Sequence, residues 1–143
     1  MYIFTQTEAR KGQTPNPRGH KSEHMTVNCR GRHLTPSILL CKFLGLHAGA
    51  HISFALSDDG NKAYIRRADD PDDSPNTQTS KAFYKTKDGK FLRFSCSEAV
   101  RAVLSLAGAQ SSCTCHVTPN PTFDNETGKT FYQILTSFPI MIN

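Results

Sequence analysis

The stretch of residues 30–67 constrains the fold of this 143-residue chain more than any other part of its sequence. Apolar residues dominate positions 38–44 and Gly45 follows them, which predicts a short, nearly fully buried helix that ends at the glycine. Thr35 is a favourable N-cap, and Pro36 suits the first helical position, where a missing N–H costs nothing. We therefore expect the helix to begin at this Thr-Pro pair.

Two strands joined by a tight turn are predicted to follow this helix. Over residues 51–56 apolar side chains alternate with small or polar ones, which is the period of a half-buried strand. The Asp-Gly-Asn sequence at 59–61 is a strong hairpin signal, and residues 62–67 supply the returning strand. Together with a first strand before the helix, residues 26–67 are predicted to form one β-α-β-β module.

A second, weaker copy of this module is predicted further along the chain. Residues 90–94 have the pattern of a strand, and Ser95 with Glu98 forms a Ser-x-x-Glu capping box for a following helix. A Pro/Asn/Gly-rich hairpin loop over 118–129 and a strand over 130–135 complete the unit. The expected fold class is therefore α+β and β-rich, with two tandem β-α-β-β modules.

The flanking segments are expected to be extended. Residues 1–25 are mostly polar and contain several glycines and prolines, which predicts an extended N-terminal arm. Residues 68–84 contain four aspartates and two prolines, and we interpret them as an acidic linker. The second module and a C-terminal tail occupy residues 85–143. The apolar tail at 138–142 is expected to dock on the core or on a neighbouring subunit.

Charge is unevenly distributed along the chain, whose formal net charge is +5. Residues 1–67 hold ten Lys and Arg against four Asp and Glu, whereas residues 68–80 hold four Asp and no Lys or Arg. A basic first half permits nucleic-acid binding, although an ordinary solvated surface has the same composition.

The cysteine count and the hydropathy pattern indicate the cellular compartment of the protein. Five cysteines, an odd number, disfavour a fully paired disulfide framework, and in a reducing compartment we expect most of them to be buried as small apolar residues. No apolar run approaches the roughly 20 residues needed to span a bilayer. The first residues lack the basic lead and apolar region of a secretory signal. We therefore expect a cytoplasmic, intracellular location and no membrane partner.

The first module carries a short signature. It reads Gly-Arg-His-Leu-Thr-Pro over residues 31–36 and Leu-Gly-Leu-His-Ala-Gly over residues 44–49. These motifs resemble those of the AbrB/SpoVT family of swapped-hairpin transcription regulators, and the two-copy layout is similar to that of the MraZ branch. The likeness covers residues 26–67 and, more faintly, residues 90–135. The family's Gly-Asp after the helix is Gly-Ala here, and the second module lacks the Gly-Arg motif.

The resemblance implies an interlocked, swapped-hairpin-like small barrel formed by two modules, with arginines on one face contacting DNA. By position, Arg32 matches the arginine of the family's Gly-Arg motif, and Lys42 lies near the basic pair of its helix. From the sequence itself, Arg30 and Arg32 alternate along the first strand and so face one side. Arg66 and Arg67 end the hairpin. These five residues are the predicted DNA-binding set, although charges at a hairpin edge also discourage aggregation.

The sequence predicts no catalytic residue, no metal site and no cofactor. The nearest approach to a metal motif is Cys-Thr-Cys-His over residues 113–116, but on a strand the two thiols face one side and the imidazole faces the other. No P-loop, dinucleotide fingerprint or nucleophile elbow occurs, and acidic residues gather in the linker and turns. We therefore expect a protein that is not an enzyme and has no small-molecule substrate.

Two functions remain open from the sequence. The leading hypothesis is a homo-oligomeric, transcription-regulator-like protein that binds double-stranded DNA. The alternative is a structural or assembly protein, such as a phage or mobile-element component located in the virion, whose arm and tail contact neighbouring subunits. The linker is long enough for the two modules to pair within one chain or between chains.

Overall fold

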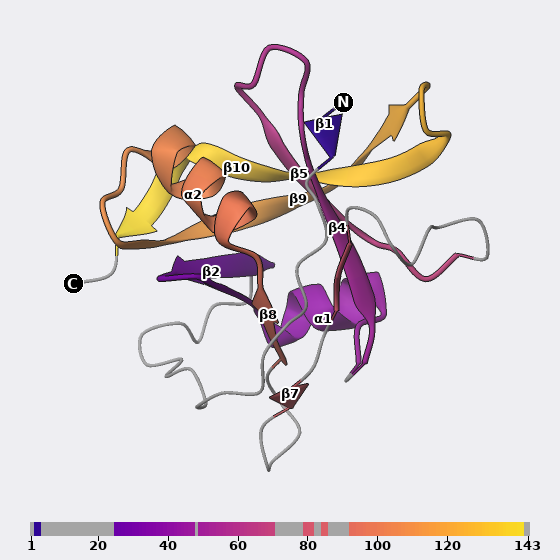
Figure 1. Ribbon diagram of the computed structural model, residues 1–143, viewed down its shortest axis with the longest axis horizontal. Coiled ribbons are helices and arrows are strands. Elements are labelled where there is room, and N and C mark those ends of the chain that lie inside the picture. The colour runs from indigo at the N-terminus through magenta and orange to yellow at the C-terminus, as the bar shows by residue number, and fades with distance from the viewer. Residues whose placement is uncertain are drawn as a thin grey trace.

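The structure of the protein is a computed structural model that describes residues 2–3, 25–47, 49–70, 79–81, 84–85 and 92–141 (Figure 1). The predicted arm over residues 1–25 therefore lies almost entirely outside the described residues. Most of the predicted linker over residues 68–84 lies outside them as well. The described part of the chain is β-rich and contains two helices.

The elements follow one another in the order β1 (Tyr2–Ile3), β2 (Thr26–Arg30), β3 (His33–Pro36), α1 (Ile38–Leu44), β4 (His51–Leu56), β5 (Ala63–Arg67), β6 (Thr79–Lys81), β7 (Tyr84–Lys85), β8 (Leu92–Ser95), α2 (Ser97–Ala107), β9 (Ser112–Asp124) and β10 (Lys129–Met141). Each helix thus comes directly after a short strand and is followed by a hairpin. α2 packs against β10, whereas α1 packs beside β2 and β3 (Figure 1).

The strands form one antiparallel sheet in the order β1-β4-β5-β10-β9-β2-β3-β8-β7. The seven strands from β4 to β8 in this order curl into a half-barrel. The short strand β6 pairs with β4, and the short strand β7 pairs with β8, so these two strands lie at the two edges of the half-barrel. The α+β, β-rich class predicted from the sequence is confirmed at this level.

The two halves of the chain join along three strand pairs, one of which is the pair of β2 with β9. In the pair of β3 with β8, Leu34 lies opposite Phe94. In the pair of β5 with β10, Ala63 lies opposite Ile134. All four side chains are buried in the core, and each large one stabilises the fold by about 1.5–3 kcal/mol through burial. The core is therefore shared between the halves.

The predicted first strand is a hairpin. β2 ends at Arg30 and β3 begins at His33, with Gly31 and Arg32 forming the turn between them. Gly31 has φ of 62°, a left-handed conformation that glycine adopts without steric cost. The prediction that Arg30 and Arg32 alternate along one strand is therefore wrong.

The first helix begins later than predicted. Thr35 and Pro36 belong to β3, where both pair with β2. Ser37 is the N-cap instead, and its Oγ accepts a hydrogen bond from the backbone N–H of Leu40 at 3.2 Å. Pairing with a neighbouring strand thus overrides the local capping preference of Thr35.

The predicted capping box of the second helix is also wrong. Ser95 is the last residue of β8, where it pairs with His33 of β3. Cys96 occupies the N-cap position of α2 and makes no side-chain capping bond. Glu98 still lies in the first turn, where a carboxylate interacts favourably with the helix dipole.

The second hairpin is longer than predicted. Pro119, Asn120 and Pro121 of the expected loop over 118–129 lie in β9, because this strand continues to Asp124 and β10 begins at Lys129. β10 then continues to Met141, which places most of the predicted tail in the sheet. Phe138 is nevertheless 88% exposed, so this residue of the tail does not dock on the core, and docking on a neighbouring subunit stays a prediction.

All five cysteines are free and buried, which confirms their predicted role as small apolar residues. Burial raises the pKa of the Cys41 thiol to about 12. This thiol therefore stays protonated at neutral pH. Cys113 and Cys115 face the same side of β9, and their sulfur atoms lie 3.9 Å apart in the core.

Candidate functional site

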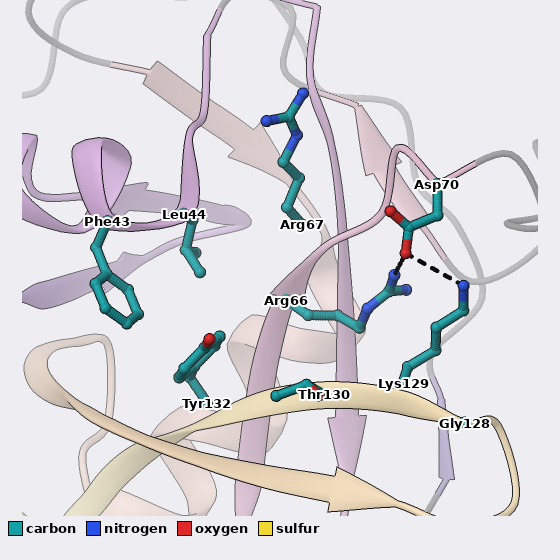
Figure 2. A pocket seen from close by; sticks show the side chains of 9 residues that line it. All are labelled: Phe43, Leu44, Arg66, Arg67, Asp70, Gly128, Lys129, Thr130 and Tyr132. Carbon is teal, nitrogen blue, oxygen red and sulfur yellow. Dashed lines mark hydrogen bonds and ion pairs between the residues drawn. The ribbon is translucent and has the colours of Figure 1, made fainter.

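A groove opens between the C-terminal end of α1, the end of β5 and the turn that leads into β10. Its cavity volume is about 360 Å³, and Figure 2 shows its lining side chains. The lining residues are Phe43, Leu44, Arg66, Arg67, Asp70, Gly128, Lys129, Thr130 and Tyr132. Three of these residues are cationic and one is a carboxylate, so the lining has an excess of positive charge.

Two of the cations converge on one carboxylate oxygen. Asp70 Oδ2 accepts hydrogen bonds from Arg66 Nη2 at 3.1 Å and from Lys129 Nζ at 3.2 Å (Figure 2). The Arg66 side chain is only 7% exposed, and its guanidinium lies 5.8 Å from the centroid of the Phe131 ring. The Asp70 side chain is 60% exposed. An anionic partner is needed here because an unpaired buried charge costs several kcal/mol.

Asp69 holds the third cation in place. Its Oδ2 accepts a hydrogen bond from Arg67 Nε at 2.8 Å. Its Oδ1 accepts one from the backbone N–H of His51 at 3.1 Å and lies 3.0 Å from His51 Nδ1. Burial raises the pKa of the Asp69 carboxyl, but the hydrogen bonds from Arg67 and His51 outweigh burial, and the pKa lies below its usual value. The Arg67 side chain remains 42% exposed.

A close approach of α1 to Arg67 shapes one wall of the groove. Gly45 ends α1 with φ of 72°, and its backbone N–H donates hydrogen bonds to the carbonyl oxygens of Cys41 and Lys42. A Cβ atom at Gly45 would lie 2.8 Å from Arg67 Nη1. Glycine is therefore favoured at this position for two reasons. It adopts the left-handed conformation without steric cost, and its missing side chain leaves room for the guanidinium.

Two aromatic rings lie beside the cations. Phe43 of α1 and Tyr132 of β10 form an edge-to-face pair with ring centroids 4.9 Å apart. Phe43 is 43% exposed although it is a large apolar side chain. The groove thus combines positive charge with an accessible apolar surface (Figure 2).

The structure brings three of the five predicted DNA-binding residues to this part of the molecule. Arg66 and Arg67 line the groove. Lys42 is exposed in the last turn of α1, next in sequence to the lining residue Phe43. Arg66 differs from the expectation of a surface cation, because it is buried against Phe131.

The other two predicted residues lie elsewhere. Arg30 and Arg32 are exposed at the turn of the β2–β3 hairpin. The opposite end of this hairpin adjoins α1, because Thr26 and Ser37 exchange backbone and side-chain hydrogen bonds there. At about 3.3 Å per residue, Arg30 lies about 13 Å along β2 from Thr26. The five cations therefore do not form one contiguous patch.

Sequence reasoning missed the two aspartates that bind the arginines and several of the residues that line the groove. Asp69 and Asp70 were assigned to a linker, although their spacing of two and four residues from the arginines they bind was a usable signal. Lys129 reaches Asp70 across a sequence separation of 59 residues. No local pattern reports such a contact. Tyr132 was predicted only as a strand residue.

The described ranges of the chain contain no group of three or more His, Cys, Asp or Glu residues arranged to hold a metal ion. Neither of the two described helices has the length and apolarity required to cross a membrane.

Comparisons of the chain with protein-family models, with curated proteins and with solved structures found no match.

Proposed function

We propose that this protein is a non-enzymatic, transcription-regulator-like protein that binds double-stranded DNA, and that the groove beside α1 contacts phosphates of the DNA backbone. The observation that carries the proposal is the convergence of Arg66, Arg67 and Lys129 around one open groove. Cations gathered on one surface neutralise phosphates and release condensed counterions, which is the main source of sequence-independent affinity.

Lys42 extends this surface beyond the groove. It is exposed on α1, directly before the groove residue Phe43. Arg67 is half-exposed and held in position by Asp69. A cation that is already oriented loses less side-chain entropy when it meets a phosphate. Lys42 and Arg67 are therefore the proposed primary phosphate contacts.

Arg30 and Arg32 are proposed as a second, separate contact. Both are exposed at the tip of the β2–β3 hairpin. A cation separated from the groove by more than a Debye length, about 10 Å at moderate salt, contributes independently of it. We expect their contribution to be smaller because only two cations meet there.

We further propose that the described elements form two tandem β-α-β-β modules of the AbrB/SpoVT swapped-hairpin type, paired within one chain. The element order β3-α1-β4-β5 is repeated as β8-α2-β9-β10. Leu34 pairs with Phe94, and Ala63 pairs with Ile134. In each of these pairs, a residue of the first module meets the corresponding residue of the second. Two copies related by an approximate two-fold axis produce this kind of pairing.

One observation favours a second candidate, an assembly protein of a phage or mobile element. Phe138 is 88% exposed, and Leu135 and Ile140 on the same strand are also exposed. Exposed apolar residues that gather on one strand are typical of surfaces that contact another protein. Such a surface also supports the proposed homo-oligomer. The first candidate corresponds to a cytoplasmic protein and the second to a virion component.

The test of DNA binding is fluorescence anisotropy with a random-sequence duplex at several salt concentrations. We expect the logarithm of the affinity to fall linearly with the logarithm of salt concentration. The double variant Lys42→Gln/Arg67→Gln should reduce the steepness of that fall by about 1.8, which corresponds to two lost phosphate contacts. Arg101→Gln is the control for the loss of a single exposed cation, because Arg101 is exposed on α2 and does not line the groove.

Absence of duplex binding at low salt would rule out the DNA-binding function. Equal losses in the groove variant and in Arg101→Gln would leave only non-specific attraction to a basic protein. Light scattering of the same samples would then decide the second candidate. A homo-oligomer that Phe138→Ser converts to monomers would support an assembly role.

A further inference from the structure

We infer that Asp70 occupies the phosphate position of the groove and competes with DNA for Arg66 and Lys129. The inference rests on the proposed DNA binding and concerns the regulation of that same site. Asp70 presents one oxygen to two cations from different strands, Arg66 of β5 and Lys129 of β10. A phosphate oxygen accepts the same two hydrogen bonds with the same charge.

The burial of Arg66, Lys129 and Asp70 indicates which of these side chains an incoming phosphate displaces. Arg66 is 7% exposed and Lys129 is 15% exposed, whereas Asp70 is 60% exposed. The two cations are thus largely buried, and the carboxylate that joins both of them (Figure 2) is largely exposed to solvent. An incoming anion therefore displaces Asp70 without unpacking the core.

Exchange of the Asp70 carboxylate for a phosphate avoids the energetic cost of removing an anion from beside the buried Arg66. Removing Asp70 alone would leave the buried Arg66 without this anionic partner, which is costly. A phosphate that replaces the carboxylate restores the pairing. The groove lining has three cations and one carboxylate, so it retains an excess of positive charge for an anion with more acceptor oxygens.

The position of Asp70 in the chain makes it an effective competitor. It lies three residues after Arg67 and is followed in the sequence by Pro-Asp-Asp at 71–73, residues outside the described ranges. A competitor on the same chain acts at a high effective concentration and lowers the apparent affinity for an external phosphate. DNA affinity is therefore set by the difference in binding free energy between a DNA phosphate and the Asp70 carboxylate at this site.

The rings of Phe43 and Tyr132 define the rest of the site. They lie on the α1 and β10 sides of the groove, and Phe43 is accessible to solvent. A deoxyribose next to a phosphate in the groove would pack against this apolar surface. The ligand is accordingly a phosphodiester of a DNA backbone, with its phosphate on Arg66 and Lys129.

The first experiment compares Asp70→Asn with Asp58→Asn in duplex binding at constant salt. Both variants remove one negative charge, but Asp58 lies in the β4–β5 turn, at the other end of β5 from Arg66. We expect Asp70→Asn to bind about tenfold more tightly than wild type, while Asp58→Asn stays within about twofold. Equal gains in both variants, or no gain in Asp70→Asn, would overturn the inference.

Lys129→Gln gives an independent check that leaves the Arg66–Asp70 pair in place. It should weaken duplex binding, and the double variant Asp70→Asn/Lys129→Gln should lose most of the gain of Asp70→Asn, because both changes act at one phosphate position. Wild-type affinity in Lys129→Gln would contradict the assignment. This variant also decides the question if Asp70→Asn does not fold.

A second readout separates this inference from the DNA-binding proposal. Inorganic phosphate is titrated against wild type and Asp70→Asn, and the melting temperature is followed, because a ligand of the folded state raises it. Phosphate should raise the melting temperature of Asp70→Asn more than that of wild type. If duplex binding fails but this difference is present, only the DNA function is lost. If duplexes bind and the difference is absent, the role of Asp70 is wrong.

Discussion

The two long hairpins of the sheet carry different chemistry at corresponding positions. In the second and third positions of β4, Ile52 and Ser53 pair with Arg67 and Arg66. In the second and third positions of β9, Cys113 and Thr114 pair with Met141 and Ile140. The same place in the framework therefore carries two cations in the first hairpin and two apolar residues in the second.

The helices that precede these hairpins differ in a related way. α1 has seven residues and leaves Ile38, Leu39 and Phe43 partly exposed. α2 has eleven residues and buries Ala99, Val100, Val103 and Leu104. The longer helix covers the core, and the shorter one leaves an open space beside the arginines. The two halves thus differ in how far the helix covers the core, as well as in charge.

The largest predicted effect concerns the junction that both halves share. Phe94→Ala should lower the free energy of unfolding by about 3–5 kcal/mol, because it removes a fully buried ring opposite Leu34. Phe123→Ala is the control, since this ring is largely exposed and its loss should cost about 0.5 kcal/mol or less. Urea unfolding followed by circular dichroism measures both. Two separate transitions in Phe94→Ala would contradict a shared core.

The two glycine C-caps permit a matched comparison of the halves. Gly45 ends α1 with φ of 72° and Gly108 ends α2 with φ of 70°, so alanine at either position should cost about 1 kcal/mol of stability. Only at Gly45 does the added Cβ meet another residue, Arg67 Nη1. Gly45→Ala should therefore also weaken duplex binding, whereas Gly108→Ala should not. Equal effects on binding would show that Arg67 is not a DNA contact.

A smaller effect on duplex binding is expected for the two predicted cations that lie away from the groove. Arg30→Gln/Arg32→Gln should weaken duplex binding by about threefold or less, because these residues form a separate contact of two cations. The groove variant Lys42→Gln/Arg67→Gln should lose more. Anisotropy at one low salt concentration ranks the two. The opposite ranking would move the DNA contact from the groove to the β2–β3 turn.

The smallest predicted effect is a pH dependence that belongs to the first half. The pKa of Asp69 is lowered from 3.8 in the folded state, so the unfolded state binds the proton more readily. The stability it contributes is present above that value and is lost as the pH falls through the folded pKa. Asp69→Asn should reduce the loss of stability on acidification by about 1 kcal/mol or less, because solvent screens ion pairs near the protein surface. Urea midpoints at neutral and acidic pH measure it, and an unchanged acid sensitivity would contradict the role of Asp69.

Local patterns were sufficient for much of the first half. The apolar run and Gly45 predicted the body and the end of α1, and alternation with the turn at 59–61 predicted β4 and β5. The start of α1 was misplaced because Thr35 and Pro36 are held by pairing with β2, a contact that local propensity does not contain. The second hairpin was shortened for the same reason, since its prolines lie in paired strands.

The candidate site was only partly predictable. Arg66 and Arg67 were identified because they end a strand in a basic half of the chain. Their partners were not, because Asp70 stood in a run that has the composition of a linker and Lys129 belongs to the other half. The alternation that predicts Arg30 and Arg32 on one strand face requires Gly31 to be a strand residue. Its left-handed conformation instead forms a turn.

The position of β2 has a consequence for how the chain acquires its structure during synthesis. β2 is an early strand, yet one of its two neighbours in the sheet is β9, where Val27 lies opposite Cys115. During translation the ribosome releases β2 long before β9 exists, so one edge of this strand has no partner until most of the chain has emerged. Contacts of such large sequence separation slow folding and leave strand edges open to aggregation. Chains that stop before β9 should therefore be cleared by quality control and not accumulate as a folded first half.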